Sequence, residues 1–409
     1  MRGSITISEA AKLTPTKPVS ERALIWLGAI TTAVVVTNLF APQVLIGLIA
    51  RSLDMSEWQT GLISSLTLLG YTVGMLLLMP LVDLLENRRL ILRTLACAIL
   101  AALGTALAPT PALLLLATFI LGVSCAAIQM TVPLVASMIP PARRGQAIGE
   151  VVSGLMFGIL LSRPIASLIA DAWNWRAFYF LSAIAMAILL GALGRYLPAL
   201  QPQAKASYGG LLLSFPKLLR DEPVLRVRAW SAALAMASFS AFWAAVALRL
   251  PDAPFRLDAK GIASFALIGV AGAAAASLAG RWGDRGWTRP LLIAAHLLII
   301  AALALCAWSV LLESRIAALV AMTIGATLLD FGITTDQTLG RRAINLLYPE
   351  ARGRLNGLFV ALFFLGGTAG SAAASFAWAH SGWVAVCAVG AFFGVLALVT
   401  DIATRTGTS

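Results

Sequence analysis

One carboxylate, Asp330, lies in the middle of an apolar run that is long enough to cross a bilayer, residues 316–340. It comes 15 residues after Arg315 and 11 residues before Arg341, or roughly 22 and 16 Å along a helix. At that depth the loss of water disfavours the charged form of a carboxyl group, so that uptake and release of a proton become feasible. Asp330 is therefore a candidate for proton coupling or cation binding; the alternative is a structural ion pair or a hydrogen bond between helices.

Two further charges lie in or near apolar spans. Asp336 comes five residues before Arg341, near the expected water interface, where it fits either a gating salt bridge or a solvated face. Arg163 comes eight residues, or about 12 Å, before Asp171, and its guanidinium keeps its proton. Arg163 could recognise an anion, set the pKa of a neighbouring group or act as a structural anchor. On these counts about 10 Å of depth separates Arg163 from Asp330, a gap that only water would bridge.

Few other residues suggest chemistry. The two histidines, His296 and His380, stand apart from other candidate ligands and predict neither a metal site nor a proton relay. The four cysteines lie in apolar runs without metal-ligand spacing. The sequence contains no GxxxxGK[ST] phosphate-binding loop and no nucleophile paired with a base. We therefore predict that the protein is not an enzyme and holds no metal or cofactor.

The composition is that of a membrane protein. Of 409 residues, 60% are hydrophobic and 12% are charged, whereas about a quarter of the residues of a soluble domain are charged. A net charge of +12 would suggest nucleic-acid binding in a soluble protein. Here the basic residues fall between apolar spans, where they orient a membrane protein. The expected partner is the lipid bilayer, and no nucleic acid is expected to bind.

Twelve apolar runs of about 20 residues are separated by charged or turn-forming clusters. With the N-terminus placed in the cytoplasm, most of the 30 Lys and Arg residues fall on the cytoplasmic side. We therefore expect both termini in the cytoplasm and the spans in a bacterial inner membrane. The predicted spans are 23–50, 57–82, 90–108, 111–138, 146–170, 175–197, 228–250, 259–281, 290–311, 316–340, 354–379 and 382–402.

The spans divide into two related sets of six. A shift of 208 positions aligns Gln129 with Gln337 and Gly158 with Gly366, among other pairs. Two six-helix repeats in the same orientation predict a transporter with its site between them. The polar connection between the sets contains an amphipathic segment suited to a membrane interface. The predicted parts are a cytoplasmic tail 1–22, a bundle 23–197, the cytoplasmic connection 198–227, a second bundle 228–402 and a cytoplasmic tail 403–409.

The chain resembles the major facilitator superfamily along essentially its whole length. The family signature after the second span of each half is roughly G-x-x-x-D-R-x-G-R-R, and the matching segments are PLVDLLENRR, 80–89, and GRWGDRGWTR, 280–289. In the first copy, Leu84 stands where the family usually has Arg. The resemblance implies that these signature loops latch one conformation through acidic and arginine side chains; ordinary loop charges are the alternative. The signature-loop and cytoplasmic-gate candidates are Asp83, Arg88, Arg89, Asp284, Arg285, Arg289, Asp336 and Arg341.

The fifth span, GLMFGILLSRPIAS, resembles the glycine-rich motif of the drug–proton antiporter branch, with Arg163 in place of a glycine. The segments SRPIASLIADAWNWRAFYF and DFGITTDQTLGRRAINLLYPEARGRLN look most like the arabinose-efflux-permease-like exporters. In this family the first, fourth, seventh and tenth spans line the central cavity. Amides and aromatic rings in those spans are candidates for solute binding, and packing between helices is the alternative. The implied cavity residues are Asn38, Gln129, Phe239, Phe242, Trp243 and Gln337.

These features together predict an all-α integral membrane protein of the major facilitator fold. Its expected function is the export of a small organic solute in exchange for protons, by alternating access and as a monomer. A proton-coupled uptake symporter of a small metabolite and a non-transporting membrane sensor on the same fold are the alternatives.

Overall fold

The computed structural model describes residues 20–140, 143–199, 207–269, 278–279, 281–282, 285–345 and 352–403. These residues form α-helices, short 3-10 segments and connecting turns, with no strand among them. The predicted terminal tails lie almost entirely outside the described residues, as does 200–206 of the predicted central connection. The all-α architecture agrees with the sequence prediction.

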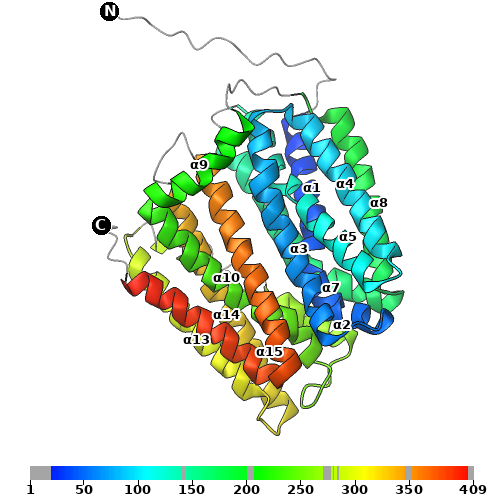
Figure 1. The fold of residues 1–409 in the computed structure, drawn as a ribbon, viewed down its shortest axis with the longest axis vertical. Coiled ribbons are helices and arrows are strands. Elements are labelled where there is room, and N and C mark those ends of the chain that lie inside the picture. Colours follow the sequence, from blue (N-terminus) through cyan, green and yellow to red (C-terminus); the bar gives the residue numbers. More distant parts are fainter. Residues whose placement is uncertain are drawn as a thin grey trace, which may run out of the picture.

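Helices α1 to α8 form the first half (Figure 1). Pro42 begins α2 directly after the end of α1, because its ring lacks the N–H that a continuous helix needs. Pro80 falls in the 3-10 segment η1, whereas Pro164 lies inside α7. The elements are α1 Glu21–Phe40, α2 Pro42–Ser52, α3 Glu57–Leu78, η1 Met79–Asp83, α4 Asn87–Leu107, α5 Pro111–Ser124, α6 Ala127–Ser137, α7 Arg144–Ala172 and α8 Trp175–Tyr196.

Helices α10 to α15 form the second half. The long helix α15 bends at Gly382, which takes φ 70° and ψ −157°, a conformation that glycine adopts readily. This bend separates the two predicted spans 354–379 and 382–402. The predicted span 259–281 is described continuously only as far as residue 269. The elements are α10 Pro223–Arg249, α11 Ala259–Ala266, η3 Leu267–Gly269, α13 Thr288–Ser309, α14 Arg315–Asn345 and α15 Arg352–Ala403.

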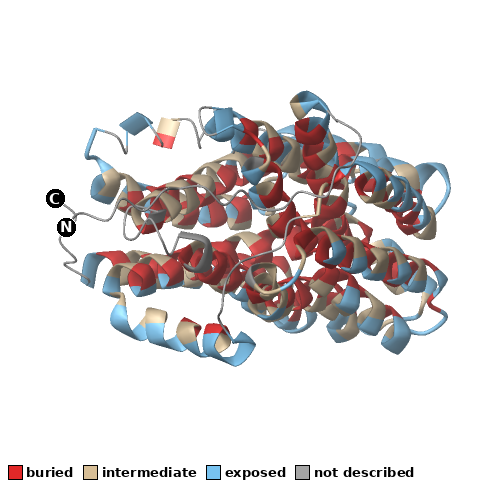
Figure 2. Ribbon diagram, turned by 90° about the horizontal axis from the view of Figure 1, so that it is seen from above, coloured by how far each residue is buried: buried red, intermediate tan, exposed pale blue. Residues whose placement is uncertain are grey.

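The outer surface suits a bilayer. Ten described helical stretches are long and apolar enough to cross a membrane, and one of them contains the bend at Gly382. Large apolar side chains such as Leu100, Ile188 and Ile316 are 69%, 68% and 75% exposed. Figure 2 shows the buried residues inside the bundle and the exposed residues on its outer faces. An apolar surface of this extent is stable against lipid tails rather than against water.

Three pairs of described helices join the halves: α3 lies along α15, α7 contacts α11, and α2 contacts α10. Figure 1 shows α3 and α15 side by side between the two groups of helices. We call the end of the bundle where α1 begins and α15 ends the terminal face, and the other end the opposite face. Any substrate path between the halves must run along this contact.

The amphipathic segment predicted in the central connection is helix α9, Tyr208–Asp221. It lies at the terminal face and contacts both halves. The Tyr208 hydroxyl donates to the carbonyl oxygen of Leu77 in α3 at 2.9 Å. Leu211 and Phe215 are buried, whereas Leu213 is exposed. Helix α9 therefore packs one apolar side against the bundle and turns another outward, as the sequence pattern predicts.

Candidate functional site

Arg163 on α7 lies in a buried cluster at the contact between the two halves. Only 2% of the residue is exposed. Its Nε and Nη2 both donate to Oε1 of Gln43 on α2, at 3.0 and 2.8 Å. Because a buried guanidinium needs polar partners in place of water, this amide holds the cation from within the first half.

The second half meets the guanidinium through Trp243 on α10. The guanidinium carbon of Arg163 lies 4.0 Å from the centroid of the indole ring, which is a cation–π distance. The same indole donates its Nε1–H to Oδ1 of Asp330 on α14 at 3.2 Å. Asp330 is 5% exposed. One side chain therefore contacts both a buried cation of the first half and a buried carboxylate of the second half.

This geometry corrects the predicted gap between Arg163 and Asp330. The sequence placed them about 10 Å apart in depth, with water as the only bridge. In the structure both contact Trp243, so an indole is the bridge, and their opposite charges attract each other across the halves.

Aromatic rings surround the guanidinium of this cluster. The rings of Phe40 on α1 and Phe239 on α10 have their centroids 5.4 and 5.7 Å from its central carbon. Phe242 is fully buried and makes edge-on contacts with Trp243 at 5.4 Å and with Trp383 at 5.6 Å. Of the predicted aromatic contacts, Phe239 and Trp243 therefore face the cluster, whereas Phe242 packs against the indole as core.

A second set of polar contacts surrounds Tyr71 on α3. Gln129 on α6 donates its Nε2–H to the hydroxyl of Tyr71 at 3.1 Å. The Tyr71 ring contacts Phe364 of α15 edge-on at 4.6 Å, and Arg341 on α14 interacts electrostatically with Tyr71. The predicted residues Gln129 and Arg341 thus meet at a tyrosine that links the halves. Gln337 lies half-buried on α14.

Asn38 lies elsewhere than predicted. It is fully buried on α1, and its Oδ1 accepts a hydrogen bond from the hydroxyl of Ser182 on α8 at 2.9 Å. Its Nδ2 donates to the carbonyl oxygens of Val34 and Val35. Because these contacts all lie within the first half, they support the alternative of a hydrogen bond between helices, and Asn38 is not part of the cluster around Trp243.

Asp336 also differs from the prediction. It is 2% exposed and faces the interior of the second half. Its Oδ1 lies 3.1 Å from Nε2 of His296 on α13 and accepts from the Ser231 hydroxyl on α10 at 3.4 Å. The prediction that His296 is isolated is therefore wrong, because helix packing brings together residues that are 40 positions apart. Asp336 does not stand at a solvated mouth between the halves.

The signature loops are described in part. In the first, Arg88 donates to the carbonyl oxygen of Gly194 near the end of α8, and Arg89 pairs with Glu86 at 2.7 Å on the surface. The side chain of Asp83 and all of Asp284 lie outside the described residues. Arg285 and Arg289 are exposed. Within the described part of these loops, the structure shows a contact of Arg88 with a helix end, the kind of contact that a latch would use.

At the terminal face a hollow of about 790 Å³ lies along α1 and α7. Phe157 lines it six residues before Arg163, or about 9 Å along the helix. All residues that line the hollow belong to the first half. Its lining combines charged and aromatic side chains, which include Glu21, Arg22, Trp26, Arg143, Glu150 and Phe157.

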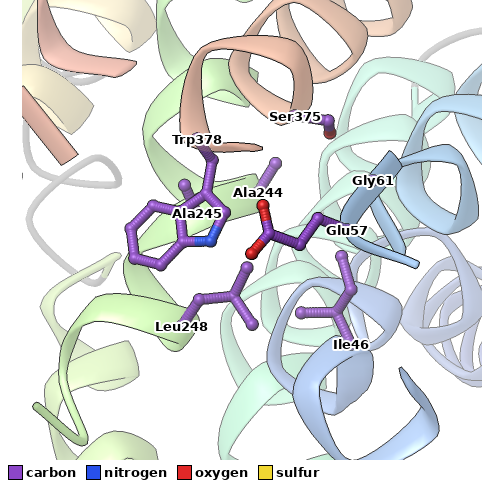
Figure 3. A pocket seen from close by; sticks show the side chains of 8 residues that line it. All are labelled: Ile46, Glu57, Gly61, Ala244, Ala245, Leu248, Ser375 and Trp378. Carbon is purple, nitrogen blue, oxygen red and sulfur yellow. The ribbon is translucent and has the colours of Figure 1, made fainter. Parts of the chain in front are cut away.

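At the opposite face the halves are closed. The pocket there has a volume of about 10 Å³ and lies between α2 and α3 of the first half and α10 and α15 of the second. Figure 3 shows the carboxylate of Glu57 and the indole of Trp378 in this pocket. Gly61 lies so close to Ser375 that a Cβ on the glycine would overlap the serine side chain. The structure is thus sealed at the opposite face and hollow at the terminal face.

A family model described as "Major Facilitator Superfamily" matches residues 26–339. The chain belongs to the major facilitator superfamily. This major facilitator chain is 34% identical over 386 residues to the "Uncharacterized transporter YgaY" of Escherichia coli O157:H7, with 94% of this chain and 96% of the relative covered. It is 29% identical over 380 residues to the "Probable transporter SCO4007" of Streptomyces coelicolor, with 92% and 86% covered.

A solved structure of the same superfamily fold is the xylose transporter XylE of E. coli in a partially occluded, inward-open conformation. The TM-score is 0.71, with 95% of this chain and 98% of XylE covered and 13% identity. At that identity the likeness shows the fold alone. Together the comparisons confirm the predicted major facilitator fold and show a multi-pass membrane transporter that is not an enzyme.

Sequence reasoning did not select several residues of these clusters. Gln43 follows Pro42 in an otherwise apolar run, and that polar residue was a visible signal. Tyr71 carries no charge and did not stand out among apolar neighbours. Asp401 lies inside the last predicted span, so the rule that selected Asp330 applied to it as well.

Proposed function

We propose that this major facilitator chain exports a small organic solute in exchange for protons and that Asp330 binds the proton. The observation that carries the proposal is the indole of Trp243, which contacts Arg163 of the first half and Asp330 of the second. A carboxylate that is 5% exposed and faces an opposite charge across the moving contact is suited to couple protonation to the relative position of the halves.

The proposed cycle rests on the charge of Asp330. When the carboxylate is ionised, its attraction to Arg163 favours the closed contact around Trp243. When it takes up a proton, that attraction is lost and the halves separate more easily. Reciprocal linkage then requires that a solute that binds at the ionised carboxylate competes with the proton, which is exchange.

This logic also assigns a charge to the solute. Exchange with protons at one carboxylate favours a cationic solute, whose charge Asp330 would balance while the rings of Trp243 and Phe239 pack against its apolar part. Arg163 favours the second candidate, a proton-coupled uptake symporter. An anionic solute on Arg163 would take the place of the carboxylate and thereby promote protonation of Asp330, so that solute and proton would bind together.

The overall arrangement follows the sequence-based proposal. The two six-helix bundles, 23–197 and 228–402, rock about the central cluster, with both termini and the terminal face in the cytoplasm of a bacterial cell and the spans in its inner membrane. The bias of Lys and Arg supports this orientation. In this orientation the hollow along α1 and α7 opens toward the cytoplasm, and the contact of Arg88 on α4 with the end of α8 supports a latch in the first signature loop.

Small residues support membership of the exporter branch. Gly154 and Gly158 of the glycine-rich fifth span face the backbone of α1 so closely that a Cβ on either would overlap it. Such close packing matches the role implied for the antiporter motif, although Arg163 stands where the motif has a glycine. The proposed working unit is a monomer, because the central site lies between two halves of one chain.

The test combines binding and flux. Purified wild-type protein and the Asp330→Asn variant are screened by thermal shift against a panel of cationic drugs, organic acids and sugars, because ligands that bind the folded state stabilise it. Proteoliposomes loaded with a pH-sensitive dye then receive each stabilising compound. Asp171→Asn, an exposed carboxylate at the end of α7, is the matched control.

Exchange predicts that protons leave the vesicle when a cationic compound enters it. Asp330→Asn should abolish this proton release, whereas Asp171→Asn should not. Movement of protons in the same direction as an anionic compound would replace exchange by symport. Binding without any flux in wild-type vesicles would support a sensor and overturn the transport proposal.

A further inference from the structure

A second cluster of ionisable side chains lies inside the second half, apart from the contact between Arg163 and Asp330. His296 on α13 is fully buried, and Asp336 on α14 and Asp401 on α15 are 2% and 3% exposed. Arg228 on α10 completes the set. The four groups therefore bring together α10, α13, α14 and α15, the four longest described helices of the second half.

Both nitrogens of the His296 ring face a carboxylate. Nε2 lies 3.1 Å from Oδ1 of Asp336, and Nδ1 lies 3.4 Å from Oδ2 of Asp401. A neutral imidazole has one N–H and one lone pair, so one of the two carboxylates would face a lone pair. A doubly protonated ring instead presents a donor to each carboxylate. With both aspartates ionised, the geometry therefore favours an imidazolium.

The charges of the neighbouring groups lead to the same result. Arg228 Nη2 lies 2.5 Å from Oδ1 of Asp401, so the guanidinium balances one carboxylate. The second carboxylate, Asp336, has Ser231 as a neutral partner. Without a further positive charge the buried cluster would carry a net charge of −1, which is unfavourable away from water. One proton on His296 makes the cluster neutral.

Unpartnered atoms mark the place of the missing donor. Among the described residues, Nδ1 of His296 and Oδ2 of Asp401 are buried without a hydrogen-bond partner, as is Oδ2 of Asp336. Nδ1 and Oδ2 of Asp401 are nevertheless close enough for an ion pair. A hydrogen on Nδ1 would satisfy both atoms after a small shift of either side chain.

A metal ion fits this cluster less well than a proton does. The ligand atoms of His296, Asp336 and Asp401 lie within 4.8 Å of one another, a separation compatible with an ion. However, the lone pairs of the two ring nitrogens diverge, so an ion on one nitrogen leaves the other facing a carboxylate. A divalent ion with neutral His296 would also give the cluster a net positive charge.

We propose that His296, Asp336 and Asp401 form a proton-binding site in which His296 is held as an imidazolium between two carboxylates, separate from the site at Asp330. Loss of that proton leaves two carboxylates on one neutral ring, which weakens the contacts of α13 with α14 and α15. Because Asp336 follows Asp330 by six residues on α14, or about 9 Å, the proton stabilises the helix that carries the central carboxylate. The inference holds for either direction of transport.

The composition of the chain allows a direct test, because the sequence has two histidines. His380 is exposed and stacks on Phe376, so His380→Gln leaves His296 as the single imidazole. The variant, labelled with ¹⁵N-histidine, is reconstituted in lipid bilayers near neutral pH, and solid-state NMR distinguishes the imidazolium from the two neutral tautomers. The same spectra are recorded in the His380→Gln background with Asp336→Asn and with Asp401→Asn.

The expected result is two protonated ring nitrogens in the His380→Gln protein and a neutral tautomer once either aspartate is replaced. A neutral imidazole in the His380→Gln protein would overturn the proposal. A change of the ring signals that zinc chloride causes and a chelator reverses would also overturn the proposal, because it would identify a metal site. Asp330→Asn, which leaves the cluster intact, should leave the imidazolium signals unchanged. If either aspartate variant misfolds, the ring signals of the His380→Gln protein still decide between an imidazolium and a neutral ring.

Discussion

Gly158 and Gly366, which are 208 residues apart, make the same kind of helix contact in the two halves. A Cβ on Gly158 would overlap the backbone of Ala33 on α1, and a Cβ on Gly366 would overlap the backbone of Ala233 on α10. Each glycine thus lets one helix approach the first helix of its own half. The internal repeat seen in the sequence corresponds here to a repeated packing contact.

This relationship predicts that Gly158→Ala and Gly366→Ala each destabilise the protein by about 1–3 kcal/mol, because the added methyl group overpacks a backbone contact. Gly149→Ala and Gly357→Ala are matched controls on the same helices and at the same spacing, since a Cβ at either position meets no atom within 4 Å. The controls should be neutral or slightly stabilising. Thermal unfolding in detergent measures all four, and equal effects at packed and open glycines would contradict the prediction.

Trp243→Phe should separate the two roles of the indole. Phenylalanine keeps an aromatic face for the guanidinium of Arg163 but removes the Nε1–H that donates to Asp330. We expect folding to be retained and proton-coupled flux to fall about tenfold. The reason is the loss of a hydrogen bond to a charged group, which contributes roughly 1.5–3 kcal/mol. Flux assays test Trp243→Phe, and thermal unfolding of Trp243→Phe, Asp330→Asn and the double variant gives the coupling energy. Additive effects would show that the two residues act independently.

Arg163→Lys should impair the protein despite conserving the charge. Lysine cannot present two donors of a planar group to Oε1 of Gln43, and it stacks less well on the indole. We expect a loss of stability of roughly 1–3 kcal/mol from the hydrogen bonds that are left unmade. The control is Arg176→Lys at the start of α8, which also lies over a tryptophan but is half-buried and donates to the carbonyl oxygen of Ala108 rather than to an amide side chain. Similar unfolding temperatures for the wild type and Arg163→Lys would refute the prediction.

Tyr71→Phe should remove the hydrogen bond from Gln129 and keep the edge-on contact with Phe364. The expected loss is about 0.5–1.5 kcal/mol. Gln129→Ala should lose a similar amount, and the double variant should lose little more than either alone, because both changes remove the same bond. Unfolding measurements on the three variants test this. Losses that simply add would place Gln129 and Tyr71 in separate interactions.

Gly61→Val should disfavour closure of the opposite face, because its side chain would enter the space of Ser375. The halves would then separate at that face more often. A cysteine introduced at Ala245, which lines the closed pocket and is 2% exposed, reports this opening through its reaction with a membrane-impermeant thiol reagent. We expect several-fold faster labelling in the Gly61→Val background than with Gly61. Unchanged labelling would show that this contact does not control the face.

Local pattern was enough to predict much of the molecule. Apolar runs of bilayer length predict the helices, because a backbone in hydrocarbon must satisfy its own hydrogen bonds. The boundary between the predicted spans 354–379 and 382–402 falls where the structure bends at Gly382. The special status of Asp330 and Arg163 also follows from sequence alone, since a charge within an apolar span needs a reason to be there.

Only the tertiary structure decided which polar groups meet. Asn38 turns to Ser182 inside the first half, and Asp336 turns to His296 inside the second, although both lie on helices expected to line the cavity. The direction of a side chain depends on the rotation and tilt of its helix, which packing against neighbouring helices sets. For the same reason residue counting could not place Trp243 between Arg163 and Asp330, whereas the packed helices do.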